Sequence, residues 1–182
     1  MGVETARLHL RPLTEADLDE LVDLDGFAEV RTAVDPFGEL IPQDAAARRE
    51  YERTFLAREG FLAAFEGPVG RFVGWFQLEP DSERPAELEL GYRLRPDAWG
   101  RGLASEGAAA LLADALTRED VVRVYAHALL SNAGSIRVME KIGMSYAAPW
   151  SYRGLVGAEY EARPPDGADA TPGPRSAPAK RP

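Results

Sequence analysis

The sequence of 182 residues contains no cysteine. Disulfide bonds, thiolate zinc sites, iron–sulfur clusters and cysteine nucleophiles are therefore excluded. Histidine is scarce too, since His9 and His127 are the two present and they fall in separate predicted strands. Because the carboxylates follow no metal-ligand spacing, we expect no metal site.

Long apolar runs and an excess of positive charge are also missing. The longest apolar run, Ala108 to Ala113, is too short to cross a bilayer, and the first residues, MGVETARLHLRP, lack the apolar core of a signal peptide. We therefore expect a soluble cytoplasmic protein with no membrane partner. With 21 Lys and Arg against 30 Asp and Glu, the net charge of −9 disfavours nucleic acid and favours a cationic partner.

The composition changes sharply after Ala162. Residues 163–182 contain six of the 14 prolines, no large apolar residue and a net charge of +2, so residues 1–162 carry −11. A chain of this length fits one domain with a sizeable core. We predict one folded domain over 1–162 and a disordered, Pro/Ala-rich tail over 163–182.

Apolar periodicity within 1–162 predicts a mixed sheet covered by helices, of α+β class. The expected order is a strand around 8–10, helices over 14–25 and 44–58, strands over 61–66, 71–78 and 87–94, a helix over 102–117, a strand over 121–128, a helix over 134–142, and closing strands near 145–149 and 156–162. The helix over 44–58 is expected to place Ala47, Tyr51, Thr54 and Phe55 on one face. A strand, helix and strand in succession imply a parallel crossover.

A strand, a glycine-containing loop and the start of a helix follow one another between Glu89 and Glu106. Gly100 and Gly102 allow a tight turn, and the free amides of the next helix, with Arg101, would suit a phosphate. The same loop also fits a purely structural turn. A dinucleotide fingerprint needs glycine where Ser105 stands, and the Walker Gly-Lys-Ser/Thr is absent, so nicotinamide and nucleoside triphosphate are disfavoured.

A second segment runs from Asn132 to Gly143, between a predicted strand and a predicted helix. Taken alone, this segment indicates a structural role, in which Asn132 or Ser131 caps the helix and Gly143 ends it.

The two segments together resemble the acetyl-CoA-binding signature of the GNAT N-acetyltransferase superfamily, and more narrowly that of its RimJ/RimL-type branch. The branch pattern Gly-Tyr-x-Leu-x-Pro, Trp-Gly-x-Gly-x-Ala-Thr-Glu and Asn-x-x-Ser-x-Arg-Val-x-Glu-Lys-x-Gly matches residues 91–96, 99–106 and 132–143 at nearly every fixed position. Residues 5–14 and 74–76 extend the similarity. The resemblance implies an acetyltransferase domain over 1–162, with six to seven mostly antiparallel strands, helices on both faces and a V-shaped splay between strands four and five.

The resemblance also implies acetyl-CoA as co-substrate and no metal. The backbone of Tyr92 to Leu94 would hold the pantetheine arm, amides of Arg101 to Ser105 the pyrophosphate, and Asn132 would hydrogen-bond the arm. The residues expected near the cofactor are Tyr92, Arg93, Leu94, Trp99, Gly100, Arg101, Gly102, Leu103, Ala104, Ser105, Asn132, Ser135 and Lys141.

Transfer to an amine needs a base, because lysine-type and α-amino groups have pKa values of about 10.4 and about 8. Glu89 is the candidate catalytic base, since it matches a glutamate that often precedes Gly-Tyr in the branch, although it equally fits a solvated strand carboxylate. Glu87 shares its face of the strand and is the second candidate. His127 is interpreted as a structural or exposed histidine.

No residue of the sequence is an obvious proton donor for the departing thiolate. Many family members place a tyrosine seven residues after the asparagine, and here Met139, which cannot donate a proton, stands there. Tyr146, Ser135 and solvent remain the alternatives. Because cysteine and a Gly-x-Ser-x-Gly elbow are absent, we expect direct transfer without an acyl-enzyme.

The resemblance thus predicts an N-acetyltransferase acting on a primary amine, either a peptide or protein N-terminus or a small cationic amine. The alternative is an acetyl-CoA-binding sensor or partner subunit without transferase activity. Dimers are common in the family, so the resemblance also allows a homodimer.

Overall fold

The computed structural model describes residues 2–67 and 70–165. Its elements are β1 (Val3–Glu4), β2 (Leu8–Pro12), η1 (Glu15–Asp17), α1 (Leu18–Leu24), α2 (Ala28–Val34), α3 (Ala45–Leu56), β3 (Phe61–Glu66), β4 (Arg71–Pro80), β5 (Glu87–Leu94), η2 (Pro96–Ala98), α4 (Leu103–Leu116), β6 (Arg123–Leu129), α5 (Ala133–Lys141), β7 (Ser145–Tyr152) and β8 (Leu155–Ala162). The last strand ends at Ala162, where the predicted tail begins. Most of that tail, residues 166–182, lies outside the described residues.

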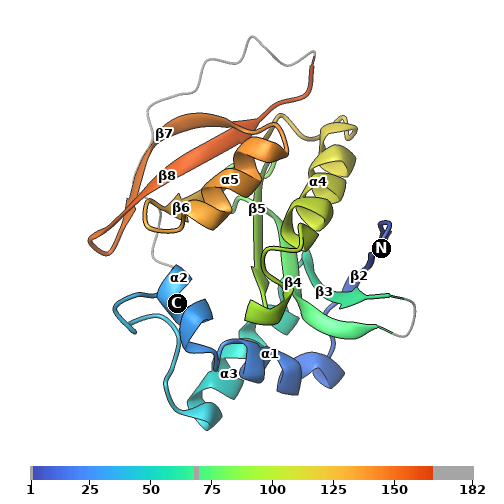
Figure 1. Cartoon of the computed structure of the whole chain (residues 1–182). Helices are drawn as coiled ribbons and strands as arrows, with labels where there is room; N and C mark the ends of the chain where they lie inside the picture. Colours follow the sequence, from blue (N-terminus) through green and yellow to red (C-terminus); the bar gives the residue numbers. More distant parts are fainter. Residues whose placement is uncertain (1, 68–69, 166–182) are drawn as a thin grey trace.

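The described strands form one sheet in the order β1-β2-β3-β4-β5-β6-β8-β7 (Figure 1). Strands β2 to β5 pair antiparallel in succession, and α4 makes the predicted crossover between the parallel strands β5 and β6. The described residues form eight strands where six to seven were expected, and one of them is the two-residue strand β1, which is too short to leave a periodic signal.

Strands β5 and β6 separate soon after they begin, which confirms the predicted V-shaped splay. They pair only from Glu87 opposite Arg123 to Glu89 opposite Tyr125. Strand β5 continues to Leu94 on β4, while β6 continues to Leu129 on β8. Glu89 therefore stands at the apex of the V.

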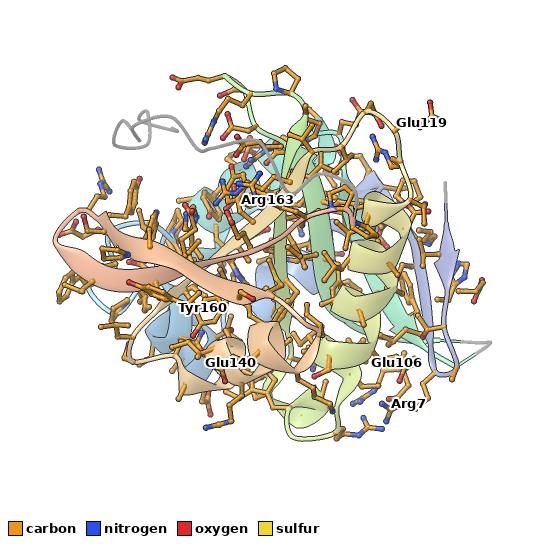
Figure 2. The ribbon with its side chains drawn as sticks, turned by 90° about the horizontal axis from the view of Figure 1, so that it is seen from above. Arg7, Glu106, Glu119, Glu140, Tyr160 and Arg163 are labelled. Carbon is orange, nitrogen blue, oxygen red and sulfur yellow. The ribbon has the colours of Figure 1, made fainter. Side chains whose placement is uncertain are left out.

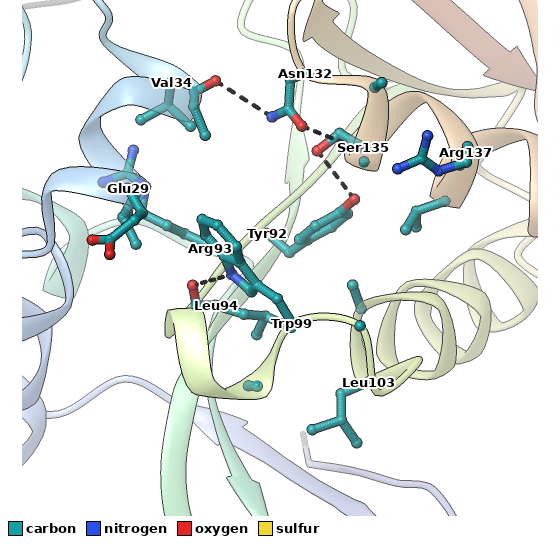
Figure 3. A pocket seen from close by; sticks show the side chains of 18 of the residues that line it. Glu29, Val34, Tyr92, Arg93, Leu94, Trp99, Leu103, Asn132, Ser135 and Arg137 are labelled. Carbon is teal, nitrogen blue, oxygen red and sulfur yellow. Dashed lines mark hydrogen bonds between the residues drawn. The ribbon is translucent and has the colours of Figure 1, made fainter.

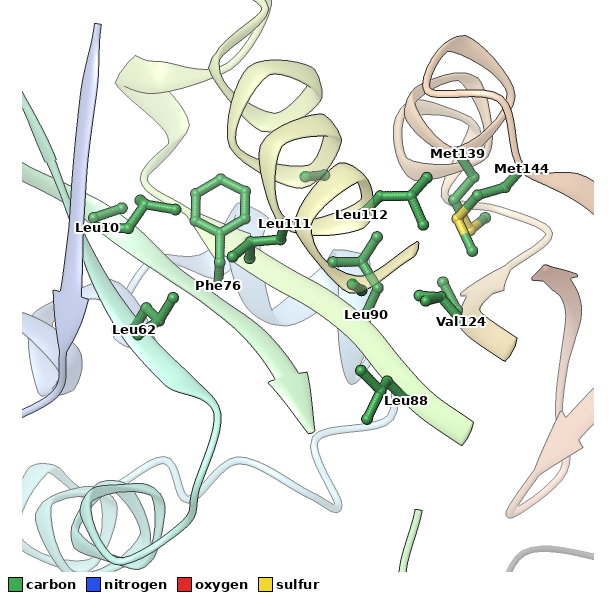
Figure 4. Packing of buried hydrophobic residues seen from close by; sticks show 14 of the residues in the cluster. Leu10, Leu62, Phe76, Leu88, Leu90, Leu111, Leu112, Val124, Met139 and Met144 are labelled. Carbon is green, nitrogen blue, oxygen red and sulfur yellow. The ribbon is translucent and has the colours of Figure 1, made fainter. Parts of the chain in front are cut away.

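One core lies between the sheet and the helices α4 and α5 (Figure 4). Leu103, Leu111 and Leu112 of α4 are buried against the sheet. The helix approaches β4 so closely that a Cβ on Gly107 would lie 2.4 Å from Cζ of Phe76. Only glycine fits there, and the tight contact fixes the start of α4 relative to the sheet.

The second core lies on the other face of the sheet, where α1, α2 and α3 pack, and this confirms the prediction of helices on both faces. This core contains Leu21 and Leu24 of α1, Val30 of α2 and Phe55 of α3. Phe55 stacks on Trp75 of β4 with ring centroids 6.0 Å apart. Helix α2 has no counterpart among the predicted elements.

The buried face of α3 differs from the predicted one. Arg48, Glu52 and Phe55 are buried, whereas Ala47 and Thr54 are exposed. Arg48 can be buried because its guanidinium donates to the carbonyl oxygens of Val22 at 2.9 Å and of Pro42 and Gln43 at 3.1 Å. An apolar pattern alone cannot foresee a helix that buries its charged positions.

None of the described helices has the length and apolar character needed to span a lipid bilayer.

Candidate functional site

A cavity of about 1310 Å³ opens between α2, the end of β5, the η2–α4 turn and the start of α5 (Figure 3). All the residues expected near the cofactor line it, apart from Arg101. They are Tyr92, Arg93, Leu94, Trp99, Gly100, Gly102, Leu103, Ala104, Ser105, Asn132, Ser135 and Lys141. Two segments some thirty residues apart in sequence are thus brought to one cavity, which we call the first cavity.

The turn before α4 presents backbone amides to the first cavity. Gly100 and Gly102 adopt φ angles of 70° and 78°, in the left-handed region that glycine tolerates. Gly102 occupies the N-cap and has no side chain to cap the helix, and the first intrahelical bond from this end is from Glu106 N to Gly102 O at 3.0 Å. The N–H groups of the first turn are therefore oriented for an anion.

Arg101 does not supply a cation to the first cavity, contrary to expectation. Its guanidinium pairs with Glu66, with Nη1 3.0 Å from Oε2, and its carbonyl accepts a hydrogen bond from Arg7 Nη1 at 2.9 Å. Arg7 is held in turn by Glu106, with Nε 2.7 Å from Oε2 (Figure 2). The side chain of Arg101 thus belongs to a surface ion pair beside the turn.

Positive charge reaches the first cavity from α5 instead. Arg137 and Lys141 both line the cavity and lie four residues apart, on one face of the helix. Arg137 was not among the expected residues, although its spacing from Lys141 was a usable signal. Together with the amides of α4, these two cations suit a phosphate-bearing ligand.

Asn132 is a helix cap, as its alternative interpretation predicted. Its Oδ1 accepts a hydrogen bond from Ser135 N at 3.1 Å, and its Nδ2 donates to Ala33 O of α2 at 3.3 Å (Figure 3). Tyr92 donates its hydroxyl hydrogen bond to Ser135 Oγ at 3.2 Å. Burial raises the pKa of the Tyr92 phenol, although the bond to Ser135 opposes this, so Tyr92 stays protonated.

A second cavity, of about 320 Å³, lies in the gap between β5 and β6, beneath the β7–β8 hairpin. It shares several lining residues with the first cavity: Ala33, Val34, Tyr92, Arg93, Asn132 and Ser135. Aromatic side chains from β4, β5 and β7 line it, namely Trp75, Tyr92, Trp150 and Tyr152. The two cavities meet where Tyr92 bonds Ser135.

The second cavity holds two candidate proton-transfer groups side by side. Glu89 and His127 both line it, and His127 Nδ1 lies 3.7 Å from Glu89 Oε1. His127 Nε2 lies 3.0 Å from Oε2 of Glu159 on β8. Burial lowers the pKa of His127, but Glu159 and Glu89 outweigh it and raise that pKa above its usual value.

The other expected acid–base residues lie elsewhere. Glu87 binds Arg123 Nη1 at 2.7 Å and lines neither cavity. Tyr146 is 59% exposed and packs edge-on against Tyr160, outside both cavities. Met139 belongs to the buried core and lines the second cavity, but its thioether cannot donate a proton. Ser135 is the alternative proton donor that reaches the junction of the cavities.

Arg93 lines both cavities, but its guanidinium is anchored by a buried partner. Its Nη1 pairs with the fully buried Asp25 at the end of α1, and its guanidinium lies 5.1 Å from the Trp75 ring centroid. Burial works against the charge of Arg93, but Asp25 raises its pKa further. Burial and Asp25 raise the pKa of the neighbouring Glu52, so this carboxyl is neutral at pH 7.

No group of three or more His, Asp or Glu side chains in the described part of the chain is arranged to hold a metal ion.

Known proteins share this architecture. A curated relative from Aspergillus fumigatus, FsC-acetyl coenzyme A-N(2)-transacetylase, is 30% identical over 156 residues, covering 79% of this chain and 65% of that protein. This chain therefore spans less than two thirds of that relative's length. Among solved structures, a GNAT-family acetyltransferase from Bacillus anthracis superposes with a TM-score of 0.76 at 20% identity, covering 90% of this chain and 98% of that one.

A second structural neighbour bears on the narrower resemblance. RimL, a ribosomal L7/L12 α-N-protein acetyltransferase, superposes with a TM-score of 0.73 at 16% identity, covering 93% of this chain and 100% of that one. At that identity the likeness concerns the fold, so the RimJ/RimL branch stays a prediction. The family model of the acetyltransferase (GNAT) domain matches residues 7–145. The chain therefore belongs to the GNAT acetyltransferase domain family.

Proposed function

We propose that this protein transfers the acetyl group of acetyl-CoA directly to a primary amine. The observation that carries the proposal is the pair of joined cavities, one with cationic and amide groups at its mouth and the other with a carboxylate inside. Acetyl-CoA supplies an activated acyl group together with a chain of phosphates. The first cavity fits the phosphates, and the second fits an amine that approaches the junction from the opposite side.

The groups at the first cavity fit the chemistry of coenzyme A. The uncapped start of α4 offers backbone N–H donors, and Arg137 and Lys141 add positive charge. The stretch of β5 from Gly91 to Leu94 pairs with β4 but not with β6, and it leads from these groups to the second cavity. We assign the pantetheine arm to this stretch, as the resemblance implies.

The groups at the junction fit the proton transfers of the reaction. Glu89, at the apex of the V, is proposed to receive the ammonium group of the acceptor and to promote loss of its proton. The bonded hydroxyls of Tyr92 and Ser135 are proposed to protonate the departing thiolate. Tyr92 and Ser135 line both cavities, which supports a position between the two substrates.

The size and lining of the second cavity restrict the acceptor. About 320 Å³ walled by indole and phenol rings accommodates a small cationic amine or the first residue of a peptide or protein N-terminus. The net charge of −9 attracts either one. An acceptor of the RimJ/RimL kind, a protein N-terminus, is the narrower form of the proposal.

Release of the CoA thiol tests the proposal. Purified protein is incubated with acetyl-CoA and a panel of polyamines, amino sugars and peptides with free N-termini, and the thiol is followed with a chromogenic disulfide. We expect release with at least one acceptor and a matching acetylated product by mass spectrometry. Binding of acetyl-CoA without release across the panel would indicate a sensor or partner subunit, and absence of binding would overturn the assignment of the first cavity.

A further inference from the structure

The imidazole of His127 faces a different carboxylate with each of its nitrogens. Nε2 is hydrogen-bonded to Glu159 at 3.0 Å, whereas Nδ1 lies 3.7 Å from Glu89, beyond hydrogen-bonding distance. His127 lies on β6 two residues past Tyr125, the last residue of β6 that pairs with β5. Its side chain is 18% exposed and lines the second cavity. Nδ1 is therefore the nitrogen that a ligand between His127 and Glu89 can reach.

Glu159 is held so firmly that it fixes the orientation of the imidazole. It lies directly opposite His127 in the β6–β8 register and is also bound by the buried Arg123. Burial opposes its ionisation, yet His127 and Arg123 lower the pKa of Glu159 to about 2. An ionised carboxylate at Nε2 keeps the proton on that nitrogen in the neutral imidazole. The lone pair of the neutral ring is then on Nδ1.

The remaining neighbours of His127 add no comparable charge. Trp150 of β7 stacks on the ring at 4.7 Å between centroids, and Tyr152 stacks behind Trp150. On β6 itself, Tyr125 packs at 5.3 Å and its hydroxyl is bonded to Asp81. Arg123 and His127 share Glu159 as a partner.

Strand β4 contributes one more carboxylate near Glu89. Glu79 lies opposite Glu89 in the β4–β5 register, and Arg58 binds it at 2.9 Å. The protonation of His127 is thus governed chiefly by Glu89 on β5 and Glu159 on β8.

We propose that Glu89 binds the acceptor as an ammonium ion, that Nδ1 of His127 takes its proton, and that Glu159 is the positioning residue for this imidazole. The proposal deepens and rests on the proposed transferase function. It also revises the sequence-based interpretation, in which Glu89 was the first candidate for the base, Glu87 was the second, and His127 was structural or exposed.

The proton and bond changes balance without a further reactant. An ammonium R–NH₃⁺ gives one proton to Nδ1, and the neutral nitrogen forms a bond to the thioester carbonyl carbon as the carbon–sulfur bond breaks. A second N–H proton passes, through the Tyr92 and Ser135 hydroxyls, to the sulfur that leaves as CoA thiol. The third stays on the amide, and the imidazolium releases its proton to solvent.

The arrangement selects a class of acceptor. An aliphatic amine is protonated in water near neutral pH, so it gains from Glu89 as an ion-pair partner and from His127 as a base. A weakly basic aryl amine arrives neutral and needs neither group for deprotonation. We therefore expect the site to favour aliphatic primary amines, and the contribution of His127 to vanish for aryl amines.

The pH profile of kcat/KM tests the proposal. With an aliphatic amine, the rate should rise through an acidic limb whose midpoint lies above about 6.5, the usual histidine value. H127Q should lower kcat/KM on the order of 100-fold and remove that limb. E159Q should shift the limb to lower pH, because loss of one neighbouring negative charge lowers the pKa of His127.

Matched controls make the outcome decisive. H9Q changes the other histidine, which is exposed on β2 and contacts Glu4, and should leave rate and profile unchanged. With an aryl amine, H127Q should match the wild-type rate, which shows that the variant is folded and binds acetyl-CoA. If H127Q does not fold, two measurements still test the role of His127: the pH profile of E159Q, and the rates of wild-type protein with aliphatic and aryl amines.

Two failures are distinguishable. If H127Q and E159Q keep the wild-type rate and pH profile with aliphatic amines while CoA is released, the role of His127 is wrong and the transferase function stands. If wild-type protein releases no CoA with any amine, both proposals fall.

Discussion

The two cavities differ in how the chain builds them. The first is formed by helix α2, the stretch from Tyr92 to Ser105 and one face of α5, and it presents backbone amides and cations. The second is formed by side chains from β4, β5, β6 and β7, and its walls contain a carboxylate, an imidazole and indoles. Under the proposed function, the cofactor would be recognised largely by local backbone geometry, and the acceptor by residues that only tertiary folding brings together.

The largest expected effect is on stability and comes from the buried ion pairs next to the second cavity. Arg123 is 2% exposed and binds Glu87, Glu159 and Glu161. R123M would leave three carboxylates without this cation, and we expect it to lower the free energy of unfolding by about 3 kcal/mol at pH 7. Urea denaturation measures the change, and R118M, which removes an exposed partner of Asp120, is the matched control.

The pH dependence of this loss follows from the low pKa of Glu159. A carboxyl whose pKa is about 2 in the folded protein and about 4.3 in the unfolded chain stabilises the fold above the higher value. That contribution disappears as the pH falls through the lower value. The gap between wild type and R123M should therefore narrow from pH 7 to pH 3. A gap that is constant with pH would mean that lost packing, not lost charge pairing, causes the effect.

An intermediate effect is expected on acetyl-CoA binding, and two glycine substitutions should distinguish it from a general loss of stability. G102A places a Cβ on a residue with φ of 78°, and G143A does the same at φ of 91° beyond the end of α5, away from both cavities. Both should destabilise the protein by about 1 kcal/mol. Only G102A should weaken acetyl-CoA binding, by about tenfold or more in titration calorimetry, because it disturbs the amides at the start of α4. Equal affinities would contradict the role of the turn.

The smallest effect should distinguish two arginines that sequence alone cannot tell apart. R137Q removes a cation from the wall of the first cavity and should raise the Kd for CoA several-fold at low salt, with a shallower salt dependence. R101Q removes a guanidinium that pairs with Glu66 outside the cavity and should leave the Kd unchanged. A larger rise in Kd for R101Q than for R137Q would place the phosphates beside the turn before α4 and not beside α5.

Much of the fold was predictable because its signals are local. Alternating residues marked β2, and runs of aromatic and aliphatic residues marked β3 to β5. The glycine-containing loop before Leu103 and the capping residue Asn132 marked the starts of α4 and α5. The exceptions have physical causes. Helix α2 buries only Val30, so it carries little apolar periodicity, and the inner face of α3 contains Arg48 and Glu52, whose burial depends on partners in distant segments.

The candidate site divides in the same way. The turn at Gly100 and Gly102 was readable because a left-handed backbone demands glycine. The contact between His127 and Glu159 spans 32 residues and exists only in the β6–β8 register. A sequence shows that Arg101 is charged but not that Glu66 holds its side chain outside the cavity.

The bond from Asn132 to α2 has an energetic consequence for both ligands. Ala33 and Val34 of α2 line both cavities, and the Asn132 side chain ties the carbonyl of Ala33 to α5 at 3.3 Å. A ligand that shifts α2 in one cavity necessarily reshapes the other. Under the proposed function, the affinities for acetyl-CoA and for the acceptor would then be linked, and by thermodynamic reciprocity each ligand would change the affinity for the other by the same factor.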